Sequence, residues 1–210
     1  MFNTLKADLD AVLQRDPAAR NRLEVFFLYS GYKAVRKYRR AHWFHQHNMK
    51  FIARWLSQRA RHKPGVEIHP GATIGKGLAI DHGMGIVIGE TTIIGDNCLL
   101  YQNVTLGGTG KETGKRHPTL GNNVMVGSGA KVLGPFTVGD NARIAANSVV
   151  LREVPPNATV VGVPGRIVRL SGEKLDHIHT PDPVMLEVDA LRARIEALEK
   201  KLEEKTAGEE

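Results

Sequence analysis

The sequence predicts a left-handed parallel β-helix that follows a helical region and precedes a C-terminal heptad helix. Three observations predict this fold. A branched apolar residue recurs every six positions through the middle of the chain, the first third holds one glycine and one proline, and the last segment repeats apolar residues at spacings of four and three. The corresponding segments are residues 1–63, 64–170 and 171–210. With 22 glycines and only 6% aromatic residues, the composition agrees with a fold of many tight turns.

Residues 1–63 are predicted to be helical, with Asp16 as an N-cap and Pro17 at the first helical position. This region holds 14 Lys/Arg against 4 Asp/Glu, including the basic run Lys33, Arg36, Lys37, Arg39 and Arg40. We interpret the run as a solvated helix face rather than a nucleic-acid surface, because no recognised nucleic-acid-binding motif accompanies it. The formal net charge of +7 therefore belongs to this region and does not indicate a nucleic-acid partner.

The middle segment repeats with a period of six, which neither an α-helix nor a flat strand explains. A chain that turns a corner every six residues does explain it, because three such units form one triangular coil and stacked coils form a parallel β-helix. The inward-pointing residues are expected to be Ile68, Ile74, Ile80, Ile86, Ile88, Ile94, Leu100, Leu106, Leu120, Val126, Val132, Val138, Ile144 and Val150. Small interior residues are expected at Ala72, Thr92, Cys98, Ala130, Ala142 and Ser148, and glycines such as Gly75 and Gly127 suit the bent backbone. The single cysteine therefore has a packing role rather than a nucleophilic one.

Two further segments depart from the hexad repeat. Between Gly107 and Thr119 the period is interrupted by glycines and basic residues, which predicts a flexible projecting loop where function is expected. A helix at about 184–204 carries the apolar stripe Val184, Val188, Leu191, Ile195, Leu198 and Leu202. This stripe is typical of a short coiled coil, and an amphipathic helix packed on its own subunit fits it nearly as well.

Polar residues at the corners of the coils are candidates for chemistry. Asp81 and His82 directly follow the interior residue Ile80. Glu67 lies 15 positions before His82, which is less than one coil of 18 residues. A carboxylate bonded to one imidazole nitrogen would raise the basicity of the other, and the Arg116 fork would suit a carboxylate substrate. Ordinary surface polar residues fit the same spacing. The histidines of this segment are too scattered to predict a metal site, and no metal is expected.

Six strings occur together and in order: Arg15-Asp-Pro-Ala18, Glu67-Ile-His-Pro70, Ile80-Asp-His-Gly83, Val104-Thr-Leu-Gly-Gly-Thr-Gly110, Arg116-His-Pro118 and Gly162-Val-Pro164. In these strings the chain resembles the serine O-acetyltransferases, from about residue 15 to 170. The resemblance implies transfer of an acetyl group from acetyl-CoA to the hydroxyl of L-serine, which gives O-acetylserine for cysteine biosynthesis in the cytoplasm. Another hexapeptide acetyltransferase, acting on a sugar or another hydroxyl, is the alternative, and a catalytically silent β-helix is a third.

The resemblance also implies roles for individual residues. His82 corresponds to the catalytic base, and Glu67 stands where many members carry an aspartate that orients this base. The serine-binding positions are Asp16, Asp81, Arg116 and His117. The positions expected along the pantetheine arm of coenzyme A are Gly108, Thr109, Ser128 and Ala146, with Lys131 and Arg143 as expected phosphate contacts.

The resemblance implies partners as well. A homotrimer is expected, and a hexamer is possible, although the helical region before Asp16 is shorter than in many members. L-cysteine is expected as a feedback inhibitor at the serine site. The end Ala207-Gly-Glu-Glu210 lacks the terminal isoleucine with which many members bind cysteine synthase, so that partner is left open. No apolar stretch approaches membrane-span length, and no membrane association is expected.

Overall fold

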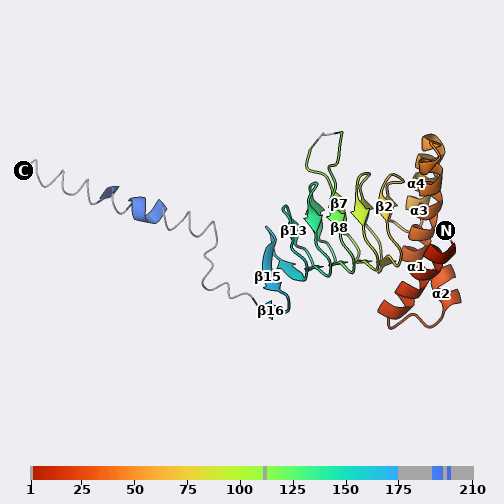
Figure 1. The fold of residues 1–210 in the computed structure, drawn as a ribbon, viewed down its shortest axis with the longest axis horizontal. Helices are drawn as coiled ribbons and strands as arrows, with labels where there is room; N and C mark the ends of the chain where they lie inside the picture. Colours follow the sequence, from red (N-terminus) through yellow and green to blue (C-terminus); the bar gives the residue numbers. More distant parts are fainter. Residues whose placement is uncertain (1, 111–112, 175–190, 196–197, 200–210) are drawn as a thin grey trace, which may run out of the picture. The chain divides into compact units, whose positions relative to one another are not determined.

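The computed structural model describes residues 2–110, 113–174, 191–195 and 198–199. Residues 1–174 form one compact unit, in which the helices lie at one end of a β-helix (Figure 1). The helices are α1 (Phe2–Arg15), α2 (Arg22–Leu28), α3 (Ser30–Gln46) and α4 (Lys50–His62). The helical region and the β-helix therefore pack together in one compact unit.

The β-helix is a triangular prism whose three parallel sheets are named here faces A, B and C. Strands of one face pair in register from coil to coil, so that Ile68 lies beside Ile88 and Ile88 beside Leu106. Face A contains β1 (Glu67–Ile68), β4 (Val87–Ile88), β7 (Thr105–Gly107), β10 (Lys131–Leu133) and β13 (Val149–Val150). Face B contains β2 (Thr73–Ile74), β5 (Ile93–Ile94), β8 (Thr119–Leu120) and β11 (Thr137–Val138). Face C begins with β3 (Ala79–Ile80), β6 (Leu99–Leu100), β9 (Met125–Val126) and β12 (Arg143–Ile144). The triangular coil that the sequence predicts is thus confirmed.

The interior is filled by the residues that the six-residue period selects. All fourteen branched residues are buried, with exposed fractions from 0% to the 7% of Ile74. The small residues are buried as well, and the thiol of Cys98 donates a hydrogen bond to the carbonyl of Gly121 at 3.1 Å. Burial raises the pKa of the Cys98 thiol to about 11. The packing role of Cys98 is confirmed, because a buried thiol of this kind stays protonated and unreactive.

The corners of the prism use two residue types for two different reasons. Gly75 and Gly127 have ordinary φ angles, but a Cβ on them would lie 2.3 Å from the Asp96 carboxylate and 2.6 Å from the amide of Ala146 in the next coil. Close approach, and not a bent backbone, requires glycine there. The left-handed backbone is instead adopted by Asn97, Asn103, Asn123, Asn141, Asn147 and Asn157, with φ between 56° and 60°. Asparagine tolerates this region better than most residues.

The predicted N-cap role of Asp16 is wrong. Asp16 follows the end of α1, and its carboxylate accepts a hydrogen bond from the amide of Ala18 at 2.8 Å, which makes a local turn. The N-cap of α2 is Asn21, whose side chain accepts from the amide of Glu24 at 2.9 Å. Asp16 thus lies in the connection between two helices.

One member of the basic run also differs from expectation. Lys33, Arg36 and Lys37 are half-buried and Arg40 is exposed, but Arg39 is 9% exposed and pairs with Asp8, which is fully buried. Arg39 points from α3 toward the prism, because α3 packs directly on the first coil: the hydroxyl of Tyr38 donates to the carbonyl of Ala72 at 2.6 Å. The solvated face therefore excludes Arg39.

The prism ends in an antiparallel addition to face C. Strand β14 (Ala158–Val161) continues the parallel sheet. Strand β15 (Arg166–Leu170) pairs antiparallel with β14, and β16 (Glu173–Lys174) pairs antiparallel with β15. Of the heptad helix predicted at about 184–204, the described residues 191–195 and 198–199 are helical. The rest of that helix, and with it the coiled coil, lies outside the described residues. Within the described ranges no helix has the length and hydropathy that crossing a bilayer requires.

Candidate active site

The residues that the sequence selects lie mainly at two corners of the prism. The C–A corner connects face C to face A through the turns 81–86, 101–104, 127–130 and 145–148. The A–B corner connects face A to face B through 69–72, 89–92, 108–118 and 134–136, which include the projecting loop. Residues 111–112 of that loop lie outside the described residues.

His82 occupies the first turn of the C–A corner. Its backbone is left-handed, with φ of 56°, and the following Gly83 donates its amide to the carbonyl of Asp81 at 2.6 Å. This tight turn directs the imidazole outward, where its side chain is 72% exposed. Its Nε2 lies 3.8 Å from an Asp81 carboxylate oxygen, and its carbonyl accepts a hydrogen bond from the Ser30 hydroxyl at 2.9 Å. A fixed backbone thus presents an accessible imidazole beside a carboxylate.

A small pocket next to this turn brings two carboxylates together. Asp16, from the end of α1, and Asp81, from the end of β3, both line it, together with Tyr29 and Tyr101. Burial raises the pKa of the Tyr29 hydroxyl, and a hydrogen bond to Asp16 and the charge of Asp81 raise it further. Arg15 also lines the pocket, and its guanidinium donates to the carbonyl of Asn97. Two acidic groups and two phenol hydroxyls against one cation leave the pocket suited to a small cationic group.

Arg116 is held at the A–B corner by the preceding coil. Its guanidinium lies 2.5 Å from the carboxylate of Glu90, and its amide donates to the hydroxyl oxygen of Thr91 at 3.1 Å. The Arg116 hydrogen bond holds the pKa of Glu90 below its usual value. Sequence reasoning missed Glu90 and Thr91. The sequence pattern that could have indicated them is their position directly after Gly89, at the A–B corner one coil before Arg116.

His117 is buried beside Arg116. Its Nδ1 accepts hydrogen bonds from the amide and the hydroxyl of Thr91 at 3.2 and 2.9 Å, so the proton of the neutral ring lies on Nε2. Burial lowers the pKa of His117, and the neighbouring Arg116 charge lowers it further. The ring lies against Gly89, where a Cβ would come within 1.9 Å of its Cδ2 atom. His117 is thus held neutral and in one orientation.

The predicted contact between Glu67 and His82 is absent, although both residues are described. The Glu67 carboxylate pairs instead with Arg61 at 3.0 Å and Arg54 at 3.7 Å, both on α4. The backbone before Glu67 does approach the turn of His82, since the amide of Gly85 bonds the carbonyl of Gly65 at 2.8 Å. Glu67 therefore follows a segment that lies next to the turn of His82, as its spacing predicts, but α4 packs against Glu67 and pairs its carboxylate with two arginines.

The expected coenzyme A residues divide between the corners. Ser128 and Ala146 lie on the C–A corner in line with His82, where the carbonyl of Ser128 accepts the amide of Asn147 at 2.8 Å. Lys131 reaches the same corner, with Nζ 2.5 Å from the carbonyl of Asn103. Gly108 and Thr109 lie on the A–B corner.

Arg143 stands apart from these residues. It lines a separate groove of about 450 Å³ with Asn141, Asn157 and Arg169, on the side of face C away from the C–A corner. One chain therefore does not bring Arg143 to the corner of Ser128 and Ala146.

The two halves of the site are also apart. Asp81 and His82 lie at the C–A corner, with Asp16 in the pocket beside Asp81. Arg116 and His117 lie at the A–B corner, so the width of face A separates the two halves. Among the described residues no group of three metal-ligating side chains comes together. A single copy thus presents an acidic half-site with an exposed imidazole and, on another corner, a basic half-site.

Comparison with known proteins agrees with this architecture. Residues 117–152 match the family described as bacterial transferase hexapeptide (six repeats). The prism and the polar residues at its corners thus define a hexapeptide-repeat transferase. Residues 1–37 match the family described as serine acetyltransferase, N-terminal.

The chain belongs to the serine acetyltransferase family. It is 57% identical over 206 residues to a serine acetyltransferase of Synechococcus elongatus, which covers 97% of this chain and 84% of that protein. It is 50% identical over 208 residues to a serine acetyltransferase of Bacillus subtilis, which covers 97% and 96%. The resemblance seen in the sequence is therefore confirmed.

Solved structures agree with the family and with the left-handed prism. The serine acetyltransferase of Neisseria gonorrhoeae in complex with serine matches with a TM-score of 0.78 and 42% identity, over 80% of this chain and 69% of that chain. The Brucella abortus enzyme in complex with coenzyme A matches with a TM-score of 0.77 and 42% identity, over 80% of this chain and 67% of that chain. A serine acetyltransferase in complex with cysteine matches with a TM-score of 0.78 and 45% identity, over 80% of this chain and 69% of that chain.

Proposed function

We propose that this protein transfers the acetyl group of acetyl-CoA to the hydroxyl of L-serine and so makes O-acetylserine for cysteine biosynthesis. The observation that carries the proposal is the pocket lined by Asp16 and Asp81, with the exposed imidazole of His82 3.8 Å from the Asp81 carboxylate. Two carboxylates suit an ammonium group, and the imidazole suits a hydroxyl proton. The family supports serine as the acceptor, and a related structure contains serine.

His82 would act as the general base. A serine hydroxyl is too weak an acid to ionise near neutral pH, so His82 would accept its proton as the oxygen attacks the thioester carbonyl. The carbon–oxygen bond forms, the carbon–sulfur bond breaks, and the imidazolium returns the proton to the departing thiolate of coenzyme A. A backbone amide near Gly108 would stabilise the transient oxyanion. No acyl-enzyme is required.

The orientation of His82 needs a carboxylate. Asp81 already lies 3.8 Å from its Nε2, whereas Glu67 is paired with Arg61 and would reach the ring only by exchanging that partner. Glu67→Gln and Asp81→Asn separate these roles. A loss of turnover in Glu67→Gln at unchanged serine KM supports Glu67 as the partner of the base. A raised serine KM in Asp81→Asn supports Asp81 as a serine ligand.

A complete site requires a second copy of the chain. Arg116 would bind the serine carboxylate, with His117 beside it, but both lie a full prism face away from His82 in one chain. Side-by-side packing of prisms would bring the C–A corner of one copy to the A–B corner of the next, which closes as a homotrimer. Coenzyme A would then lie between copies, along Gly108, Thr109, Ser128 and Ala146, with Lys131 near its phosphates. Whether two trimers pair into a hexamer is a separate question for sizing.

Complementation tests the shared site. His82→Asn is expected to lower turnover about 10²–10⁴-fold, and Arg116→Ala is expected to raise the serine KM, so both should show little activity at serine concentrations near the wild-type KM. Unfolded together and refolded, they should recover about a quarter of wild-type turnover, because random mixing rebuilds that share of the sites. Variants refolded separately and then combined are the control. No recovery in the mixed assembly would mean that each site lies within one chain.

The substrate assignment has a direct test. Purified protein is mixed with acetyl-CoA and either L-serine or a sugar acceptor, and free thiol release is followed. Serine-dependent release supports the proposal, whereas sugar-dependent release would support a different hexapeptide acetyltransferase. L-cysteine differs from serine only by sulfur for oxygen, so it should compete with serine as a feedback inhibitor. Binding to cysteine synthase is tested by co-elution of the two proteins.

A further inference from the structure

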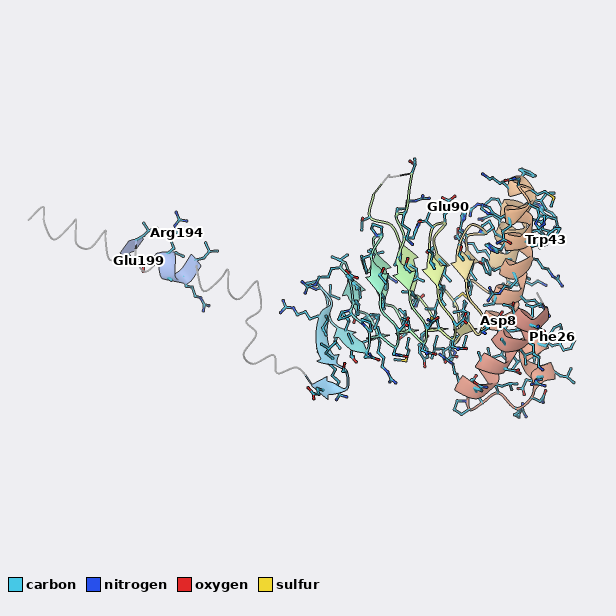
Figure 2. The ribbon with its side chains drawn as sticks, viewed as in Figure 1. Asp8, Phe26, Trp43, Glu90, Arg194 and Glu199 are labelled. Carbon is cyan, nitrogen blue, oxygen red and sulfur yellow. The ribbon has the colours of Figure 1, made fainter. Side chains whose placement is uncertain are left out.

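A buried ion pair lies where the helices meet the first coil of the prism. The Asp8 carboxylate on α1 accepts two hydrogen bonds from the Arg39 guanidinium on α3, at 3.1 and 3.2 Å. Asp8 is fully buried and Arg39 is 9% exposed. Figure 2 shows Asp8 at the junction of α1 with the β-helix.

Both members of the pair also form hydrogen bonds with the backbone of the prism. One Asp8 oxygen accepts the amides of Gly77 and Leu78 at 2.9 and 3.2 Å. The Arg39 guanidinium donates to the carbonyls of Ile74 and Gly75. The turn between β2 and β3 is therefore held from both sides.

The parts joined by this pair carry the acceptor pocket. Strand β3 begins directly after Leu78 and ends at Ile80, one residue before Asp81. Asp16 directly follows the end of α1, eight residues after Asp8, which is about 12 Å along the helix axis. Asp8 is thus connected to both carboxylates that line the pocket, to Asp16 through α1 and to Asp81 through β3.

Helix α3 adds a third connection. Its N-cap is Tyr29, which lines the same pocket, and its first residue, Ser30, bonds the carbonyl of His82. Arg39 lies on this helix, two and a half turns later. The Asp8–Arg39 pair therefore joins α1, α3 and the turn before β3, the elements next to Asp16, Tyr29 and Asp81.

Stability alone is a weak reason for such a pair. Desolvation of both charges offsets much of their attraction, and apolar replacements of buried ion pairs are often neutral or stabilising. An ion pair with fixed hydrogen bonds adds geometric specificity, because each donor and acceptor fixes an angle as well as a distance between the elements that it joins.

We infer that Asp8 and Arg39 are positioning residues, which set the separation of Asp16 from Asp81 and so determine the affinity of the pocket for the ammonium group of the acceptor. This inference rests on the proposed function. Neither residue touches the substrate.

The test measures KM for serine and for acetyl-CoA in full-length variants. In Asp8→Asn the serine KM should rise about tenfold, because small displacements of positioning groups are costly, while the KM for acetyl-CoA stays unchanged. Arg39→Lys keeps the charge but loses the fork, so it should fold and should raise the serine KM in the same direction. The matched control is Asp10→Asn, which breaks the 2.8 Å pair of Asp10 with Arg22 on the neighbouring helix and should leave both KM values unchanged.

A double variant separates positioning from folding. Asp8→Leu combined with Arg39→Met removes both charges together with the partners of the backbone groups at residues 74, 75, 77 and 78, so its melting temperature should fall. At a temperature where circular dichroism shows this variant to be folded, the serine KM should stay raised. A folded double variant, or a folded Arg39→Lys, with the wild-type serine KM would overturn the inference. Wild-type protein without serine-dependent thiol release would overturn the proposed function instead, so the two failures are distinct.

Discussion

The guanidinium of Arg116 and the carboxylate of Glu90 lie 2.5 Å apart across the A–B corner, on successive coils of the β-helix. Figure 2 shows Glu90 on the side of the prism from which the loop projects. The hydrogen bond from Arg116 lowers the pKa of Glu90, and the pair fixes one arm of the Arg116 fork. A second nitrogen of the fork donates to the carbonyl of Gly114 at 3.4 Å, a long hydrogen bond that a carboxylate ligand could replace.

Glu90→Gln is expected to raise the serine KM about fivefold, the effect of about 1 kcal/mol for a partly exposed pair. The reason is that Arg116 loses the partner that fixes its orientation. Steady-state kinetics with both substrates checks this, and the KM for acetyl-CoA should not change. Lys76→Gln, which breaks the exposed pair with Asp96 at 3.8 Å, is the control. An unchanged serine KM in Glu90→Gln would show that Arg116 needs no such support.

His82→Asn is expected to lower turnover about 10²–10⁴-fold, the usual contribution of a general base. Asparagine is chosen because it tolerates the left-handed φ of 56° at this position, so the turn should be kept. Size-exclusion chromatography should show the wild-type assembly. Near-normal turnover in this variant would contradict the proposed mechanism.

Gly89→Ala is expected to displace His117, because the new Cβ would lie 1.9 Å from the ring. Overpacking of this kind costs about 1–3 kcal/mol of unfolding free energy. Chemical denaturation measures it. Gly114→Ala is the matched control, since a Cβ added to Gly114 would have no neighbouring atom within 4 Å among the described residues. Equal stability of the two variants would mean that His117 moves aside without cost.

Acid should destabilise the fold through His117 and His69. Burial lowers the pKa of both rings below the ordinary value of 6.5. Between that value and the lowered one, the unfolded chain binds more protons than the folded chain, so stability falls as the pH falls below 6.5 and is fully present above it. The groups that face His117 are Arg116 and Lys115, which add to the shift, and Glu90, which opposes it. Denaturation curves from about pH 8 to about pH 5 measure the slope, and a flat profile would contradict the prediction.

Several features followed from the sequence by itself. The period of six selected the interior residues, and all fourteen are buried because an inward-pointing residue at each turn is a local consequence of the coil. The small size of Ala72 and Cys98 likewise follows from the narrow interior. The strings around Asp81, His82 and Arg116 carried the family resemblance without any structure.

The tertiary structure alone decided which polar groups meet. Arg39 belonged to a run expected to face solvent, but the docking of α3 on the prism buries it against Asp8. Glu67 had the right spacing for His82, but α4 presents two arginines to it. The repeat pattern is local and is written in consecutive residues, whereas ion-pair partners depend on how the helices pack against the coils. For that reason the sequence predicted the prism and its corners, and only the packed chain revealed the partners of Arg39, Glu67 and Arg116.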